Sequence, residues 1–408
     1  MKKEHLREYL KGYRDSWSIC MQCASCYYAG PIVPHNWREL PPFEWSSPYR
    51  KCPSYEYFKF RAFSPVGRGN LASIVFDDPN FPITDNLIKI VYTCTSCGTC
   101  SEICRAHDPW TVIWAFKEYL TSKGIKLPHP LPKLFANVEN CGNIFGTEKP
   151  PPVNRVIPKK GQNVLFAGCF MRFTQPNLLE TIIDVLRKAD LNLAWLGDEE
   201  LCCGFLPGQQ GDIHKMEKQA QRNVKRLKEV GASRIIVSCA HCYKALKDYY
   251  PKLIDTFPFE VVHISEIYAH LIEKGKITFN KKLQRKVTYH DPCFLGRHSK
   301  IYDEPRAVIE SIPAVKLEEM ERRRQWAYCC GSGAKAIYLC YPDFSFSISK
   351  ERLFEAKEKA DTVVTSCSSC VLQFHRAAAK LGFEIHVQDI SEIVAESLGI
   401  VSCGRNCF

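Results

Sequence analysis

Short apolar runs alternate with amphipathic segments along the chain from residue 163 onward. Four of the runs predict buried strands, at residues 164–167, 234–238, 287–289 and 362–365. Helices are predicted between and after the strands. Two of them are marked by apolar faces at helical spacing, the first formed by Leu178, Leu179, Ile182, Ile183 and Leu186 and the second by Ile213, Met216, Ala220, Val224 and Leu227. A third helix is predicted at residues 240–249. Alternating strands and helices are typical of parallel sheets, which bind ligands at the carboxyl ends of their strands.

This order of elements occurs twice. The segment that leaves the first copy, FEVVHISEI at 259–267, is matched by FEIHVQDISEI at 383–393 in the second. We therefore predict a duplicated α/β domain with parallel sheets, whose copies occupy residues 162–275 and 284–402.

Each copy carries five cysteines at similar spacing, placed where strands are predicted to end. The first cysteine set is Cys169, Cys202, Cys203, Cys239 and Cys242, and the second cysteine set is Cys293, Cys329, Cys330, Cys367 and Cys370. A single zinc ion is closed by four ligands, so five thiols drawn from three turns suit a larger, sulfur-rich inorganic centre. We expect one such centre in each copy.

The first 126 residues carry eight more cysteines in ferredoxin-like spacing. Cys20, Cys23 and Cys26 form CxxCxxC, Cys52 is followed by Pro53, and Cys94, Cys97, Cys100 and Cys104 form CxxCxxCxxxC. This pattern predicts two cubane [4Fe-4S] clusters in an α-helical ferredoxin-like domain. The last cysteine of each run ligates the other cluster in two-cluster ferredoxins, which pairs Cys20, Cys23 and Cys26 with Cys104, and Cys94, Cys97 and Cys100 with Cys52. Structural zinc is the alternative for these eight thiols.

Two departures from the ferredoxin pattern stand out. Between Cys26 and Cys52 lie 52 − 26 − 1 = 25 residues instead of three, and Cys104 is followed by Arg105 instead of proline. The insertion, residues 27–51, is either a surface loop or a cover for a cluster or partner. Residues 127–161 are rich in proline and predict an ordered linker, and residues 403–408 form a tail with Cys403 and Cys407.

Composition narrows the class of protein. The chain has 22 cysteines among 408 residues, and their tight grouping favours metal binding over disulfides. The formal charge is +11, but basic residues are dispersed and no nucleic-acid motif is present, so we expect no nucleic-acid partner. The charged first residues lack the apolar segment of a signal peptide, and no apolar stretch is long enough to span a bilayer. We expect a cytoplasmic protein that reaches the inner face of the membrane only through a partner.

The whole layout resembles one family, the heterodisulfide reductase D-type subunits and the related iron-sulfur subunits of glycolate oxidase and anaerobic glycerol-3-phosphate dehydrogenase. The resemblance rests on the two Cys-Cys-Gly (CCG) turns and the cubane motifs. Further matches are Cys52-Pro53-Ser54-Tyr55, the SPVGRG stretch at 64–69 and His290-Asp291-Pro292-Cys293. These motifs indicate the superfamily and do not select a branch.

The resemblance implies that each cysteine set holds a noncubane [4Fe-4S] cluster and that a disulfide is cleaved between the two. Two cubane clusters would carry electrons to them from a partner: a flavoprotein, a membrane cytochrome or a ferredoxin-type protein. The alternative is an electron-transfer subunit without its own substrate, which links a flavoprotein dehydrogenase or an electron-bifurcating complex to a quinone or ferredoxin pool. All ten CCG cysteines are present, which favours disulfide chemistry.

Three neighbours of the cysteines have two interpretations each. His290 and His241 are either proton donors to a leaving thiolate or hydrogen-bond donors to cluster sulfur. The arginine run at 322–324 precedes the second CCG turn and is either a solvated loop or a binding site for an anion.

Overall fold

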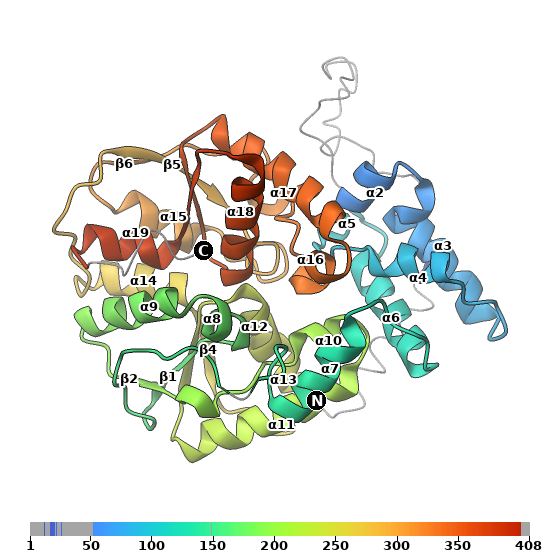
Figure 1. Ribbon diagram of the computed structural model, residues 1–408, viewed down its shortest axis with the longest axis horizontal. Helices are drawn as coiled ribbons and strands as arrows, with labels where there is room; N and C mark the ends of the chain where they lie inside the picture. The colour runs from blue at the N-terminus through green and yellow to red at the C-terminus, as the bar shows by residue number, and fades with distance from the viewer. Residues whose placement is uncertain are drawn as a thin grey trace.

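Two α/β copies, each built on a four-stranded parallel sheet, form the larger part of the computed structural model, which describes residues 12, 17–20, 22, 26, 52–147 and 149–400 (Figure 1). The first sheet has the order β2-β1-β3-β4, with β1 Asn163–Phe166, β2 Leu193–Trp195, β3 Arg234–Val237 and β4 Glu260–His263. The second has the order β6-β5-β7-β8, with β5 Arg285–His290, β6 Val315–Leu317, β7 Thr362–Thr365 and β8 His386–Asp389. The identical order confirms the predicted duplication and parallel pairing.

Helices cover both sheets. The first copy contains α8 Cys169–Thr174, α9 Pro176–Lys188, α10 Phe205–Gln209, α11 Ile213–Glu229, α12 Ala240–Lys244, α13 Tyr250–Leu253 and α14 Ile264–Glu273. The second contains α15 Asp303–Glu310, α16 Ala336–Cys340, α17 Pro342–Lys357, α18 Ser368–Leu381 and α19 Ile390–Ser397. Figure 1 shows α9, α14, α15 and α19 between the two sheets, where α9 packs on α19 and α14 packs on α15 around one apolar core.

The matching exit segments of the two copies fold alike. His263 is the N-cap of α14 and accepts a hydrogen bond from the Ser265 backbone N–H, and Asp389 does the same for α19. A glutamate three residues later accepts a hydrogen bond from each N-cap backbone N–H, which completes a capping box in both copies. The repeated residues therefore determine the point where each outer strand turns into a helix.

The ferredoxin-like region is helical in its described part, as predicted. Its elements are α2 Pro53–Phe58, α3 Pro65–Asp77, α4 Asp85–Tyr92, α5 Thr99–Ile103 and α6 Pro109–Ser122. Proline begins α2, α3 and α6, a position where its missing N–H costs nothing. Helix α6 packs against the first CCG copy. The Trp114 indole N–H donates a hydrogen bond to the Gly208 carbonyl at 2.8 Å, and the Lys117 ammonium group donates one to the Gln210 side-chain oxygen at 2.9 Å.

The predicted linker contains a helix, α7 Leu131–Cys141, which packs on α11. The Gly142 carbonyl that follows it accepts a hydrogen bond from the Cys202 backbone N–H at 2.7 Å. The linker therefore supports a cysteine of the first set. The predicted helix at 240–249 begins as expected but includes a π-helical segment, η5 Ala245–Tyr249, before α13.

No helix in the described ranges combines the length and the apolar character needed to cross a membrane.

Candidate metal centres

The five residues of the first cysteine set lie together at the carboxyl end of the first sheet. All five are buried and line one cavity, which Lys335 and Ser368 of the second copy also line. Each of these thiols perturbs the pKa of the next along the series Cys169, Cys202, Cys203, Cys242 and Cys239. Hydrogen bonding to Cys202 and Cys242 lowers the pKa of the Cys203 thiol well below its ordinary value. A set of thiols that shares protons in this way is suited to bind metal as thiolates.

Local backbone geometry brings these thiols close together. Gly168 has φ +79°, and a Cβ at this position would lie 2.8 Å from the Cys242 sulfur. The buried Glu200 carboxylate accepts hydrogen bonds from the Ala167 and Gly168 backbone N–H groups at 2.9 and 2.6 Å. Glu200 therefore holds the turn between β1 and Cys169, a role that no sequence pattern indicated.

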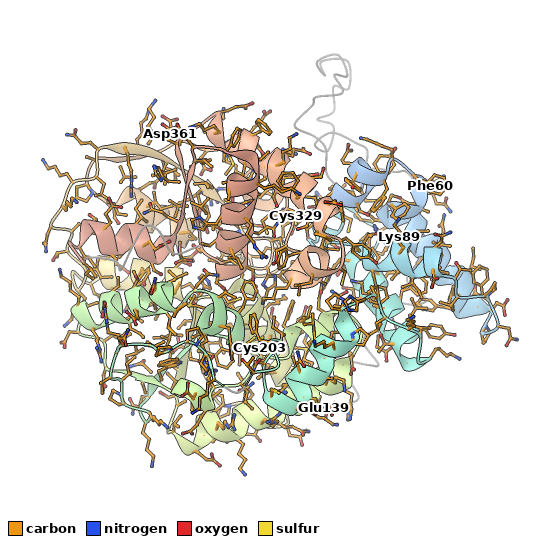
Figure 2. All side chains as sticks on the ribbon, in the orientation of Figure 1. Phe60, Lys89, Glu139, Cys203, Cys329 and Asp361 are labelled. Atoms are coloured by element: carbon orange, nitrogen blue, oxygen red, sulfur yellow. The ribbon has the colours of Figure 1, made fainter. Side chains whose placement is uncertain are left out.

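The second cysteine set has the same arrangement on the second sheet. Four of its members are buried and Cys293 is half-buried. The sulfur atoms of Cys370 and Cys330 lie 3.2 Å apart, and the Gly331 backbone N–H donates to the Cys329 sulfur at 3.3 Å. Figure 2 labels one member of each set, Cys203 and Cys329.

The two sets meet at one point. Sulfur atoms of Cys239 in the first set and Cys367 in the second lie within 4.8 Å of each other and of a ring nitrogen of His241. Hydrogen bonding to Cys242 and to Cys367 lowers the pKa of the Cys239 thiol well below its ordinary value. The two sites therefore face one another across the boundary between the copies.

The pKa values of the two buried histidines are shifted in opposite directions. Burial lowers the pKa of His241, but hydrogen bonds with Cys239 and Cys367 outweigh it and raise the pKa to about 9. His290 is buried beside Cys330 and Cys370, and burial and the adjacent Arg352 hold its pKa well below its ordinary value. The Arg352 Nε–H donates to His290 Nδ1 at 3.1 Å, so the proton of the neutral ring lies on Nε2. His290 thus has the geometry of a hydrogen-bond donor to the sulfur site.

In the ferredoxin-like region, Cys52, Cys94, Cys97 and Cys100 line one cavity, and Cys26 lines it too. Burial raises the pKa of the Cys52 thiol to about 12. The buried Arg68 guanidinium holds this site by donating to Ser54 Oγ at 2.6 Å, Thr93 Oγ1 at 3.2 Å and the Phe63 carbonyl at 2.5 Å. The structure therefore brings Cys52 to the three cysteines with which the sequence pairs it.

Cys104 does not line that cavity but lines a different one. Its sulfur is 3.5 Å from His107 Nδ1, and the Trp17 ring packs edge-on against His107 with ring centroids 4.8 Å apart. The segment that leads into Cys20 is therefore close to Cys104, and Cys20 is half-buried. Cys23, the insertion at 27–51 and the tail with Cys403 and Cys407 lie outside the described residues.

Arg297 and His298 connect the ferredoxin-like region to the second copy. The Arg297 Nε–H donates to the Cys97 carbonyl at 2.7 Å and an Nη1–H donates to the Ala327 carbonyl at 2.5 Å. His298 Nε2–H donates to the Ser96 carbonyl at 3.0 Å, and its ring stacks on Phe294, which contacts His241. Neither residue was predicted from the sequence, although they follow Cys293 by only four and five positions.

Arg322, the first residue of the arginine run, has a different role from the two that were predicted. Arg322 is buried, its guanidinium lies 4.3 Å from the Tyr328 ring centroid, and it forms ion pairs with Glu351 at 2.7 Å and Glu355 at 3.0 Å. The prediction of a solvated or anion-binding loop is therefore wrong for Arg322. Its charge is neutralised within the fold.

Polar atoms beside the cysteines fit an iron-sulfur group. Within the described part of the chain, His290 Nε2, Arg297 Nη2, Ser368 Oγ and Ser369 Oγ are buried and have no hydrogen-bond partner. Buried donors normally have an acceptor, and the sulfur atoms of a cluster accept hydrogen bonds. The donors and the two sets of five thiols therefore match a sulfur-rich cluster in chemistry.

Comparison with family models supports this assignment of regions. The model of the cysteine-rich CCG domain matches residues 163–247 and 287–375, and the model of a 4Fe-4S dicluster domain matches residues 16–107.

Comparison with curated proteins gives a relative of nearly the same extent. The chain is 35% identical to the D-type subunit of dihydromethanophenazine:CoB–CoM heterodisulfide reductase from Methanosarcina barkeri, over 76% of this chain and 78% of that protein. It is 28% identical to EtfAB:quinone oxidoreductase of Syntrophomonas wolfei, over 76% of this chain but 47% of that one. Among solved structures, a hypothetical protein from Helicobacter pylori has the same fold, with a TM-score of 0.57, 14% identity and coverage of 82% of this chain and 68% of that one.

Proposed function

Since the chain belongs to the family of heterodisulfide reductase D-type subunits and is an iron-sulfur oxidoreductase subunit, we propose that it reduces a disulfide between its two CCG cysteine sets. The observation that carries this proposal is the meeting of Cys239 and Cys367 beside His241. A disulfide has two adjacent sulfur atoms, and two facing sites offer one metal centre to each.

The overall reaction is RSSR′ + 2e⁻ + 2H⁺ → RSH + R′SH. When bound, iron-sulfur clusters supply electrons singly and offer iron to sulfur ligands. We propose noncubane [4Fe-4S] clusters on the two sets of five cysteines and cubane [4Fe-4S] clusters on the eight N-terminal cysteines.

The side chains around the facing sites have distinct tasks in this proposal. His241, which contacts both Cys239 and Cys367, is placed to give a proton to a leaving thiolate. His290 would donate a hydrogen bond from Nε2 to the sulfur of a centre held by the second set, because its Nδ1 already accepts from the Arg352 Nε–H. We therefore assign proton delivery to His241 in preference to His290.

Electrons would enter from the ferredoxin-like side. Arg297 binds the Cys97 carbonyl, and its charge also acts on Cys293 and Cys329, so the Cys52 site and the second cysteine set share one buried guanidinium. Cys104 lines a cavity of about 890 Å³ at the surface of this region, along with Arg105, Lys244, Lys252 and Lys300. We propose that a redox partner binds beside Cys104; the candidates are a flavoprotein, a membrane cytochrome that holds the protein at the cytoplasmic face of the membrane, or a ferredoxin-type protein.

Thiol titration of the oxidised holoprotein tests this function. We expect 2-mercaptoethanesulfonate, added anaerobically, to change the electron paramagnetic resonance spectrum of the CCG centres, because a thiol product binds where the disulfide is cleaved. The cubane signals of the same sample serve as the internal control and are expected to stay constant.

An unchanged CCG spectrum over a full thiol titration series, in protein with its full complement of iron, contradicts substrate chemistry at these centres. That result favours the second function, transfer of electrons between a flavoprotein and a quinone or ferredoxin pool. The similarity to EtfAB:quinone oxidoreductase is the observation that supports this alternative.

A further inference from the structure

Lys335 belongs to the second CCG copy but lies in the first cysteine site. It is 7% exposed and lines the cavity formed by the first cysteine set. Its ammonium group lies 4.8 Å from the centroid of the Phe170 ring, the residue that follows Cys169. A lysine side chain is ordinarily protonated at neutral pH, so Lys335 brings a positive charge into the cavity of the first cysteine set.

The backbone that presents Lys335 is unusual for a lysine. Ala334 has φ +55° and Lys335 has φ +80°, in the left-handed region that favours glycine. This conformation is sterically unfavourable for a residue with a Cβ atom. The Lys335 backbone N–H donates to the Ser332 hydroxyl at 3.2 Å, which closes the turn after Gly331. Such backbone strain persists where surrounding structure fixes it, and it is concentrated at functional sites.

The two copies differ at this position. Lys335 is the fifth residue after Cys330, and the fifth residue after Cys203 is Gly208, which has no side chain to extend toward the second set. The cation that acts on the second set is instead Arg297, which it shares with Cys97. The two sites therefore have the same number of thiols, but the nearby cation is Lys335 in the first site and Arg297 in the second.

We propose that Lys335 sets the reduction potential of the centre on the first cysteine set, by placing a fixed positive charge from the second copy beside its thiolates. The proposal rests on the iron-sulfur assignment above but not on a disulfide as substrate. Reduction adds one electron and one negative charge to the centre, and an adjacent ammonium group stabilises the reduced form more than the oxidised form. Lys335 therefore makes the first centre easier to reduce than it would be without this charge.

Potentiometric titration of the Lys335→Met variant tests this proposal. The measurement is made in a Cys330→Ser background, so that the CCG signal comes from the first centre alone, and without any disulfide. We expect Lys335→Met to lower the ratio of reduced to oxidised first centre at a fixed potential at least tenfold, which is about 59 mV for a one-electron couple. Lys335→Arg, which keeps the charge, is expected to restore most of the shift.

The matched control is Lys350→Met, the same loss of charge at an exposed residue of the same copy, which we expect to leave the potential unchanged. An unchanged potential in Lys335→Met, with the first centre present by iron content, overturns the proposal. If Lys335→Met loses that iron, Lys335→Gln is measured in its place with the same two outcomes. Because no disulfide is present, failure here is distinguishable from failure of the proposed reaction, which the thiol titration detects.

Discussion

Replacing Cys330 with serine is expected to lower the rate of disulfide reduction more than about a hundredfold. Loss of a residue that only hydrogen-bonds to a metal ligand already lowers metal affinity or activity roughly 10–100-fold, and Cys330 is itself a proposed ligand. Cys330 lies at the centre of the second set, with its sulfur 3.2 Å from that of Cys370 and hydrogen-bonded to Cys329. Serine offers a hard oxygen where an iron-sulfur cluster requires a soft thiolate. The variant should lose the iron of one cluster and keep both cubane signals.

Cys340→Ser is the matched control for that variant. Cys340 is a half-buried cysteine of the same copy, outside both cysteine sets, and burial raises the pKa of its thiol to about 12. We expect it to retain its iron and its activity. Full iron content in Cys330→Ser, or an equal loss in Cys340→Ser, would contradict the assignment of the second set as cluster ligands.

Arg306→Met is expected to lower the free energy of unfolding by about 3–5 kcal/mol, the usual cost of breaking a buried ion pair. The Arg306 guanidinium and the Asp291 carboxylate form two hydrogen bonds, of 2.7 and 3.0 Å, and their side chains are 6% and 2% exposed. Removal of the arginine leaves Asp291 buried with the Arg324 backbone N–H as its partner. Asp291 precedes Cys293 by two positions, so the same change should loosen the second set. Urea denaturation of the anaerobic holoprotein measures the effect.

Arg324→Met is the matched control for Arg306→Met, because it breaks an exposed ion pair instead of a buried one. Arg324 also forms an ion pair with an aspartate, Asp303, at 2.7 Å, but those side chains are 40% and 81% exposed. Solvent screening limits such a pair to at most about 1 kcal/mol. Similar losses in the two variants would show that burial of the Asp291 pair does not contribute as the structure indicates.

The fold was predicted closely from the sequence because two patterns agreed: apolar runs that mark strands, and apolar faces at helical spacing that mark the helices between them. Apolar runs marked β1, β3, β5 and β7, and all four are parallel strands that lead toward a cysteine. The strands β2, β4, β6 and β8 were not predicted. The strands β2 and β6 have only three residues each and give no period, and β4 and β8 were noted only as matching exit segments of the two copies. The helix α7 was hidden in the proline-rich linker, because prolines that begin a helix look the same in sequence as prolines that prevent one.

The cysteine sites were predicted as two groups, but their mutual position was not. Spacing within a copy cannot show that Cys239 and Cys367 meet, because that depends on how α9, α14, α15 and α19 pack. Lys335, Arg297 and Glu200 were missed for a related reason. Charged residues are mostly exposed, and only tertiary structure shows the long-range contacts of these three: Lys335 with the first cysteine set, Arg297 with the Cys97 carbonyl and Glu200 with the turn before Cys169.

Single-turnover reduction of a disulfide tests the central claim most directly. The anaerobic holoprotein is reduced, freed of excess reductant and mixed with the CoB–CoM heterodisulfide, with cystine and glutathione disulfide as parallel substrates. We predict that at least one disulfide releases two thiols for every two electrons lost from the clusters, and that Cys330→Ser releases none. Clusters that stay reduced with all three disulfides, while a quinone analogue reoxidises them, would contradict disulfide reduction by this protein.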